Sequence, residues 1–409
     1  MADVANIIER SEPQVLLKVQ TDGGTERVDL GDRLIGFTFE DSDNKTDKAS
    51  IQIDNWDLLF FDSQLIVKGA KLEVSWGYPD RMSPVRELVV RKVKGFTTLQ
   101  IEAHAKSVLM NREQKCRVFE NVTRADVARQ IAEENGFTGS FVEVEDTEEV
   151  FECINQAAET DARLLTRLGR REGFRFYVDQ TGFHWHSRRF DQPPTRAYRY
   201  YTDPDQGDIL SVSLDNDVFS KPGRSRVRGR DPRRRTTIDA SGSDADTSRD
   251  SLGDVIEVVD PETGTTSLDR RNATSSVRSS AASTEARARR EANARFRTSS
   301  RQTVKLKLRV VGDPEQLAKT IIDVQGISSF LSGKYYVKSA KHIISSSGYT
   351  LDLDCTKDGT GRLARRVERA RRSAGRPNRA PRRSRDELRP VEVVDPETGR
   401  TSVEYRRST

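Results

Sequence analysis

Two capped helices and a short hairpin, near the middle of the chain, constrain its fold more than any other feature. Thr123 is a favourable N-cap, and Asp126 three residues later completes an acidic form of the capping box. Apolar residues at helical spacing follow, and Asn135-Gly136 supplies a left-handed stop. A first helix is therefore predicted between Thr123 and Asn135.

The second helix is predicted to begin near Thr160-Asp161 and to end at Gly173. Its buried face carries Leu164, Leu165 and Leu168. FRFYV and FHWH then flank a turn at residues 179–182, which is typical of a β-hairpin. Together these elements predict an α+β module.

The regions on either side of this module show the pattern of short β-strands. Between residues 12 and 110, turn-forming residues separate six runs with alternating polarity, which are QVLLKVQ, LIGFTFEDS, ASIQIDN, KLEVSWGY, ELVVRKVKGF and TTLQIEAHAK. Strand patterns return in DILSVSLDN and RSRVRGRDP, and again from residue 303 to 355. Short strands at this spacing predict a sandwich or a small barrel.

Several of these segments resemble the phage late control D family, the baseplate hub proteins of contractile tails. In the helix pair the resemblance is carried by Gln156, Thr160-Asp161, Leu164-Leu165, Arg167-Leu168, Arg170-Arg171 and Gly173. Elsewhere it is carried by KGAKLEVSWGY (68–78), VRGRDP (227–232), GDPEQL (312–317) and the Tyr- and Ser-rich strands of residues 327–354. It covers about residues 12–358, apart from an insertion near 240–283.

The resemblance implies that each chain carries two related barrels and that three chains close a ring with pseudo-sixfold symmetry. The implied partners are two further copies of the chain (a homotrimer), a tail tube protein, a spike protein, baseplate wedge proteins and a tape-measure protein. DNA or other cargo would pass through the lumen. No β-helical repeat follows the hub region, so the spike is expected to be a separate protein. The expected location is the virion tail baseplate, after assembly in the host cytoplasm.

From the pattern and the resemblance together, we predict a mainly β chain with two tube-like β-barrel domains flanking the α+β module. The predicted divisions are a first barrel at 1–110, the module at 111–205, a discontinuous second barrel at 206–239 and 300–358, an insertion of linker, hairpin and helix at 240–299, and an Arg-rich arm with a terminal hairpin at 359–409.

The insertion contains two features of its own. A helix is predicted near residues 284–297, but it has almost no apolar stripe, so packing is not expected to be its main support. Residues 256–267 read IEVVDPETGTTS, and residues 391–402 repeat them as VEVVDPETGRTS. Each copy predicts a hairpin, which either adds to another sheet or stays solvated.

The C-terminal arm is strongly basic. The chain carries a net charge of +5, yet residues 361–390 alone hold twelve Arg against three acidic residues. The candidate partner-binding residues of the arm and its hairpin are Arg365, Arg366, Arg369, Arg371, Arg372, Arg382, Arg383, Val391, Val393 and Tyr405. Three interpretations stay open: a grip on an acidic protein, contact with DNA phosphates, and a solvated charged segment. The terminal hairpin favours a protein partner.

No motif indicates catalysis, because the sequence has no nucleophile elbow, P-loop or dinucleotide fingerprint. We expect no enzyme activity and no cofactor. His184 and His186 alternate on one strand and could form half a metal site, but no Cys or third His lies nearby in the sequence, so no metal is predicted. No apolar run reaches the ~20 residues of a membrane helix. The alternatives to a phage hub are the hub of a secretion or extracellular injection system, a nucleic-acid-binding protein that uses the arm, and a wall-degrading enzyme.

Overall fold

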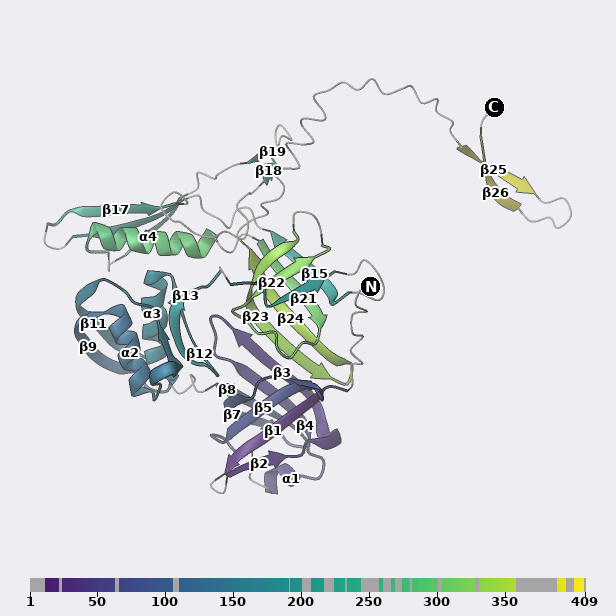
Figure 1. The fold of residues 1–409 in the computed structure, drawn as a ribbon, viewed down its shortest axis with the longest axis horizontal. Coiled ribbons are helices and arrows are strands. Elements are labelled where there is room, and N and C mark those ends of the chain that lie inside the picture. Colours follow the sequence, from purple (N-terminus) through teal and green to yellow (C-terminus); the bar gives the residue numbers. More distant parts are fainter. Residues whose placement is uncertain are drawn as a thin grey trace, which may run out of the picture. The chain divides into compact units, whose positions relative to one another are not determined.

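The computed structural model divides the chain into two compact units, Met1–Leu363 and Ala364–Thr409. It describes residues 12–21, 24–62, 66–105, 110–190, 192–200, 207–216, 224–231, 234–243, 257–259, 266–268, 274–279, 282–300, 304–327, 331–357, 388–394 and 401–407. The described chain is mainly β, as predicted (Figure 1). Among these residues, no helix has the length and apolar character needed to cross a membrane.

The first β region follows the predicted strands closely. It contains β1 (Gln14–Thr21), β2 (Gly24–Val28), β3 (Leu34–Ser42), β4 (Lys48–Asp54), β5 (Lys71–Tyr78), β6 (Arg81–Met82), β7 (Arg86–Gly95) and β8 (Thr98–Ala105), with the short helices η1 (Gly31–Arg33) and α1 (Leu59–Asp62). Alternate residues such as Leu17, Ile51 and Ile101 face one core, because strand side chains alternate between faces. Among the strands of this region, only β2 and β6 were not predicted from alternating polarity. β2 is exposed except at Val28, and β6 has only two residues, so neither shows an alternating pattern.

The α+β module contains β9 (Lys115–Thr123), α2 (Arg124–Glu134), η3 (Gly139–Phe141), β10 (Val142–Val144), β11 (Val150–Glu159), α3 (Asp161–Glu172), β12 (Phe174–Asp179) and β13 (Gly182–Ser187). The predicted capping box is confirmed, with the Asp126 amide donating to Thr123 Oγ1 at 3.1 Å. Gly173 ends α3 at a φ of 82°, as predicted. The leucines of α3 pack with Phe183 and Trp185 of β13.

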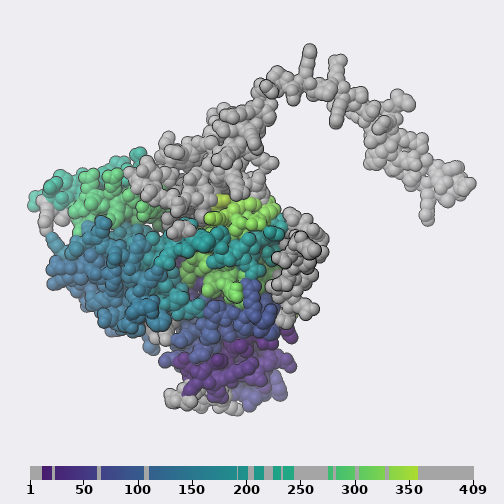
Figure 2. Space-filling view, viewed as in Figure 1, coloured from purple at the N-terminus to yellow at the C-terminus, as the bar shows by residue number. Residues whose placement is uncertain are grey.

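The second β region contains β14 (Arg196–Arg199), β15 (Ile209–Asn216), β21 (Val304–Val311), β22 (Ile321–Gln325), β23 (Gly333–Ser345) and β24 (Gly348–Lys357). Most of its buried residues form a core of their own, but Ile344 of β23 and Tyr349 of β24 pack in the core of the first region. Moreover, β23 pairs with β3, so that both regions belong to one 14-stranded sheet. In Figure 2, purple-to-blue atoms of the first region lie against green atoms of the second. Closure of either region into a barrel stays a prediction.

A separate small sheet joins strands of the insertion to strands that precede it. It consists of β16 (Arg224–Arg230), β17 (Thr237–Gly242) and β20 (Thr274–Arg278), and α4 (Glu285–Ser300) packs on it. We had expected β16 in the second barrel, but it pairs with β17 and β20. The expectation that α4 lacks packing support was wrong. Its Ala288 and Ala292 are fully buried against the sheet, and Gly242 allows this approach because a Cβ there would clash with the helix backbone.

The repeated segments form hairpins with the same register. In the first unit β18 (Glu257–Val259) pairs with β19 (Thr266–Leu268), and in the second unit β25 (Leu388–Val394) pairs with β26 (Thr401–Arg407). Val258 faces Ser267 in one copy, and Val393 faces Ser402 in the other. The duplication therefore preserves strand pairing as well as sequence.

Aromatic side chains fill the place where β3 and β23 pair. Phe39 of β3 packs on Trp76 with ring centroids 4.4 Å apart. The Trp76 indole donates to Tyr349 Oη at 3.2 Å, and His342 Nδ1 lies 2.7 Å from the same oxygen. Burial lowers the pKa of His342 to about 3, so its imidazole is neutral at pH 7. The two β regions thus share buried polar contacts besides their ladder.

A buried ion pair crosses the same junction. Asp41, at the end of β3, is 1 % exposed, and Lys319 Nζ lies 2.5 Å from its Oδ1. The amide of Ala318 donates to its Oδ2 at 3.0 Å. Burial opposes ionisation of Asp41, but the charge and hydrogen bond of Lys319 outweigh it and lower the pKa of this carboxyl. Nearby, Arg188 of the module donates through Nε to Asp43 at 2.9 Å. We call the β3–β23 pairing with these two ion pairs the seam.

Replacing Lys319 should destabilise the fold strongly. Lys319→Met leaves the buried Asp41 without its cation, and breaking a buried pair in this way costs about 3–5 kcal/mol. Lys45→Met is the control, because Lys45 pairs with Glu40 at 3.5 Å in an exposed contact and should matter little. Urea unfolding followed by tryptophan fluorescence measures both. Equal effects of the two substitutions would contradict a seam that depends on Lys319.

Candidate functional site

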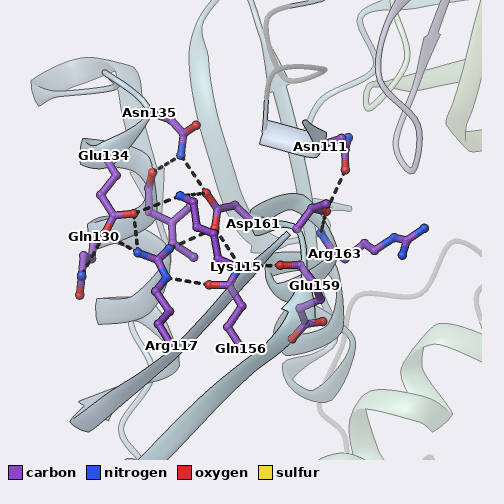
Figure 3. A network of polar contacts seen from close by, with 12 residues as sticks. Asn111, Lys115, Arg117, Gln130, Glu134, Asn135, Gln156, Glu159, Asp161 and Arg163 are labelled. Carbon is purple, nitrogen blue, oxygen red and sulfur yellow. Dashed lines mark hydrogen bonds and ion pairs between the residues drawn. The ribbon is translucent and has the colours of Figure 1, made fainter. Parts of the chain in front are cut away.

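Gln156 and Asp161, two of the residues that carry the family resemblance, lie in a polar network of the module (Figure 3). Asp161, at the start of α3, accepts hydrogen bonds from Lys115 Nζ at 2.7 Å, Gln156 Nε2 at 2.9 Å and Arg117 Nη2 at 3.1 Å. Arg117 also donates through Nε to Gln156 Oε1 at 2.7 Å and contacts Glu134 of α2. One carboxylate therefore ties β9, β11 and both helices of the module together.

The protonation state of Asp161 follows from these contacts. Burial disfavours its charge, but the hydrogen bonds from Lys115 and Gln156 outweigh burial and lower the pKa of the carboxyl. Both carboxylate oxygens are occupied by donors from the protein itself. This arrangement suits a fixed scaffold better than an acid or base that exchanges protons with a substrate.

Beside this network, a basic groove follows the exposed side of α3. It has a volume of about 1090 Å³ and is bounded by α3, β12, β20 and α4. Seven arginines line it, namely Arg163, Arg167, Arg170, Arg171, Arg175, Arg278 and Arg295, and Glu291 is the acidic lining residue. Burial lowers the pKa of Arg171, and the neighbouring charges of Arg124 and Arg167 lower it further. The groove is therefore a place where positive charges repel one another.

An exposed apolar surface lies at one end of the first β region, around α1. Trp56 is 70 % exposed and Phe96, in the turn between β7 and β8, is 63 % exposed. Phe61 packs on Phe96 with centroids 5.7 Å apart, and Leu59 is also exposed. We call these four residues the aromatic end. Clustered exposed aromatic residues are typical of protein–protein contact sites.

A second apolar surface lies on β15 of the second β region. Its Leu210 is 54 % exposed and its Leu214 is 43 % exposed. Along its length β15 pairs with β21, while its other edge makes one isolated bridge, between Ile209 and Tyr200. Among the described strands, β15 is thus a largely open edge with apolar side chains, which favours docking to another chain.

The structure places the partner-binding residues predicted from the sequence only in part. Val391 and Val393 lie on β25. Tyr405 lies on β26, where it is paired with Pro390 of β25. The seven predicted arginines fall outside the described residues; they are Arg365, Arg366, Arg369, Arg371, Arg372, Arg382 and Arg383. Their role stays a prediction.

Three features were not predicted from the sequence: the basic groove, the aromatic end, and the carboxylate of Glu143 that lies beside His184 and His186. Arg170 and Arg171 entered only as part of the resemblance, because helical spacing alone cannot show that α4 lies opposite. Glu143 of β10 lies beside His184 of β13 through parallel pairing. A strand of three residues such as β10 gives little signal in the sequence. The aromatic end did leave a signal, because Trp56 and Phe61 lie within five residues of each other and are both exposed.

The structure thus combines a mainly β scaffold, a polar network around Asp161 and exposed apolar surfaces. Comparison with known families identifies the class of protein to which it belongs. Residues 64–347 match the family described as phage tail baseplate hub (GPD), and the chain belongs to this family. No curated protein matches the chain.

Solved structures of related fold agree with this assignment. A tail protein from Neisseria meningitidis MC58 is 12% identical, with a TM-score of 0.60 over 85% of this chain and 97% of that one. The 43 kDa tail protein of prophage MuSo2 from Shewanella oneidensis is 14% identical, with a TM-score of 0.58 over 85% and 98%. An E. coli component of the type VI secretion system is 12% identical, with a TM-score of 0.51 over 83% and 76%. At these identities the likeness concerns the fold.

The basic groove should bind multivalent anions. Pyrophosphate is expected to raise the midpoint of thermal unfolding by a few degrees relative to chloride at equal ionic strength, on the order of 1 kcal/mol, because it relieves the repulsion around Arg171. The double change Arg170→Ser and Arg171→Ser should remove this shift. Arg309→Ser is the control, since Arg309 already pairs with Asp352 at 2.7 Å on an exposed strand. A shift that persists in the double variant would place the anion elsewhere.

Proposed function

We propose that this chain is the structural hub of a contractile phage tail baseplate, where three copies form a ring between the tail tube and a separate spike protein. Membership of the baseplate hub family supports the role in the tail. The seam supports the ring, because it makes two β regions into one sheet within each chain. If each region closes into a barrel, three chains present six equivalent units to a sixfold tube.

The contact that closes the ring is proposed at β15. Its exposed Leu210 and Leu214 would be covered by the first β region of the next copy, which removes apolar surface from water. An interface between identical chains in a ring joins two different surfaces and closes when the rotation allows it. In this arrangement, the contact between chains continues the alternation of β regions that β3 and β23 establish within one chain.

The aromatic end is the proposed contact with the tail tube. Trp56, Phe61 and Phe96 offer large, rigid apolar area at little entropic cost, and such residues commonly dominate the binding energy of an interface. This surface belongs to the first β region and is separate in sequence from the proposed ring contact on β15. The two surfaces can therefore be tested independently.

Further partners follow from the proposed place in the tail. Wedge proteins of the baseplate and a tape-measure protein are proposed neighbours, and the Arg-rich arm is a proposed grip on one of them. DNA would pass through the lumen, and assembly would take place in the host cytoplasm. We propose that the chain acts without catalysis, which the donor-saturated Asp161 supports.

A second candidate function is the hub of a protein-injecting machine. The fold of the E. coli type VI secretion component favours it, since that component resembles most of this chain. Neighbouring genes separate the two: capsid and terminase genes indicate a phage, and secretion genes without them indicate an injection system.

Charged residues on β15 should abolish the ring. Light scattering is expected to give a mass of three chains for the natural protein and of one chain for the double change Leu210→Asp and Leu214→Asp. Trp56→Asp is the control, because it places a negative charge on an exposed apolar residue of the other surface and should leave three chains together.

Two results would contradict the proposal. A natural protein that stays monomeric at all concentrations, alone and with its spike, would exclude the ring. A trimer that persists with the β15 changes but dissociates with Trp56→Asp would show that the aromatic end, and not β15, is the contact between the copies.

A further inference from the structure

Three possible metal ligands converge on the sheet of β10, β12 and β13. Phe183 and Trp185 of β13 point into the module core, so His184 and His186 lie on the opposite face. Glu143 of β10 lies beside them, with its Oε2 2.9 Å from His184 Nδ1 and 3.8 Å from His186 Nε2. One donor atom from each of the three residues lies within 4.8 Å of the others. Both histidines are buried, and Glu143 is partly exposed.

The hydrogen bonds of His184 fix which nitrogen carries its proton. Thr181 Oγ1 donates to Asp179 Oδ1 at 2.6 Å, so this hydroxyl can only accept from His184 Nε2, which lies 2.8 Å away. Asp179 Oδ1 is a second acceptor for Nε2, at 3.2 Å. Nε2 therefore carries a proton, and Nδ1 lies on the side of the ring next to Glu143. A carboxylate behind a histidine in this way is the usual outer partner of a metal-bound imidazole.

His186 is oriented in the same manner. Its Nδ1 lies 2.6 Å from the carbonyl oxygen of Ser187, which can only accept, so Nδ1 carries the proton. Nε2 then has a lone pair facing Glu143, and the hydroxyl of Tyr177 lies 3.1 Å away.

His184 Nδ1, His186 Nε2 and Glu143 Oε2 thus lie close to one another. At 2.9 Å, His184 Nδ1 and Glu143 Oε2 repel unless a proton or a cation lies between them. The surrounding cations are directed elsewhere: Arg189 pairs with the other oxygen of Glu143, and Lys319 pairs with Asp41 while lying over the ring of Tyr177. The place between the three donors therefore requires a positive charge.

We propose that Glu143, His184 and His186 bind a divalent transition-metal ion of the zinc type. Two imidazoles with one carboxylate suit zinc, whereas calcium and magnesium prefer oxygen ligands alone. Three protein ligands leave a coordination position for water or for a group from a partner. Because Glu143 of β10 is paired with His184 of β13, the ion would cross-link the short strand β10 to the rest of the sheet. This inference does not depend on the proposed hub function.

The test uses the full-length protein after removal of metals with a chelator. Titration with Zn²⁺ by calorimetry should show one ion per chain, and Co²⁺ should give the absorption bands of a site with nitrogen ligands. Glu143→Gln and His186→Gln should abolish both signals. Asp179→Asn, which acts through the orientation of His184, should weaken binding by roughly 10–100-fold. His104→Gln is the control, because His104 is a partly buried histidine on β8, outside the cluster.

The outcomes separate a metal from a proton. Metal bound by the natural protein and the His104 variant, but not by the Glu143 variant, supports the site. Failure of the natural protein to bind stoichiometric metal overturns it and assigns the place to a proton shared by His184 and Glu143. Unchanged binding in Glu143→Gln overturns it as well. Glu143 is partly exposed, so this variant keeps the test decisive even if His186→Gln fails to fold.

Discussion

A buried carboxylate and its ammonium partner, Asp41 and Lys319, hold the position on which the rest of the structure depends. Neither group could remain charged in this environment alone, because removing an isolated ion from water costs far more than the stability of a domain allows. Each charge therefore requires the other, and they come from segments almost 280 residues apart in the sequence. Their pairing fixes the register between β3 and β23 and makes one sheet from two β regions.

The surfaces proposed for assembly lie on the elements that this junction connects. The aromatic end belongs to the first β region, the β15 leucines to the second, and Arg188 links the module to β3 through Asp43. In the proposed ring, force would pass between the tube contact and the spike contact through these parts, which requires rigid connections between them. Buried ion pairs contribute geometric specificity here more than net stability.

Local chemistry made much of the fold predictable, and pairing between distant segments made the rest unpredictable. Thr123, Asp126 and Gly173 fixed helix ends through bonds within a few residues, and alternation marked the longer strands. The sequence carried no sign that β3 pairs with β23, or that β16 joins β20, because ladder partners are set by tertiary packing. Alanines hid the packing face of α4, and the three residues of β10 were too few to reveal Glu143 beside His184.

Hydrogen exchange of the β3 and β23 amides would test most directly whether the two β regions act as one body. If the seam unites them, amides such as those of Phe39 and Ile343, which lie in the paired strands, should exchange as slowly as that of Ile51 in the first core. Exchange at β3 and β23 that is orders of magnitude faster than in both cores would show that the regions separate. The chain would then be two linked domains rather than a single ring-building unit.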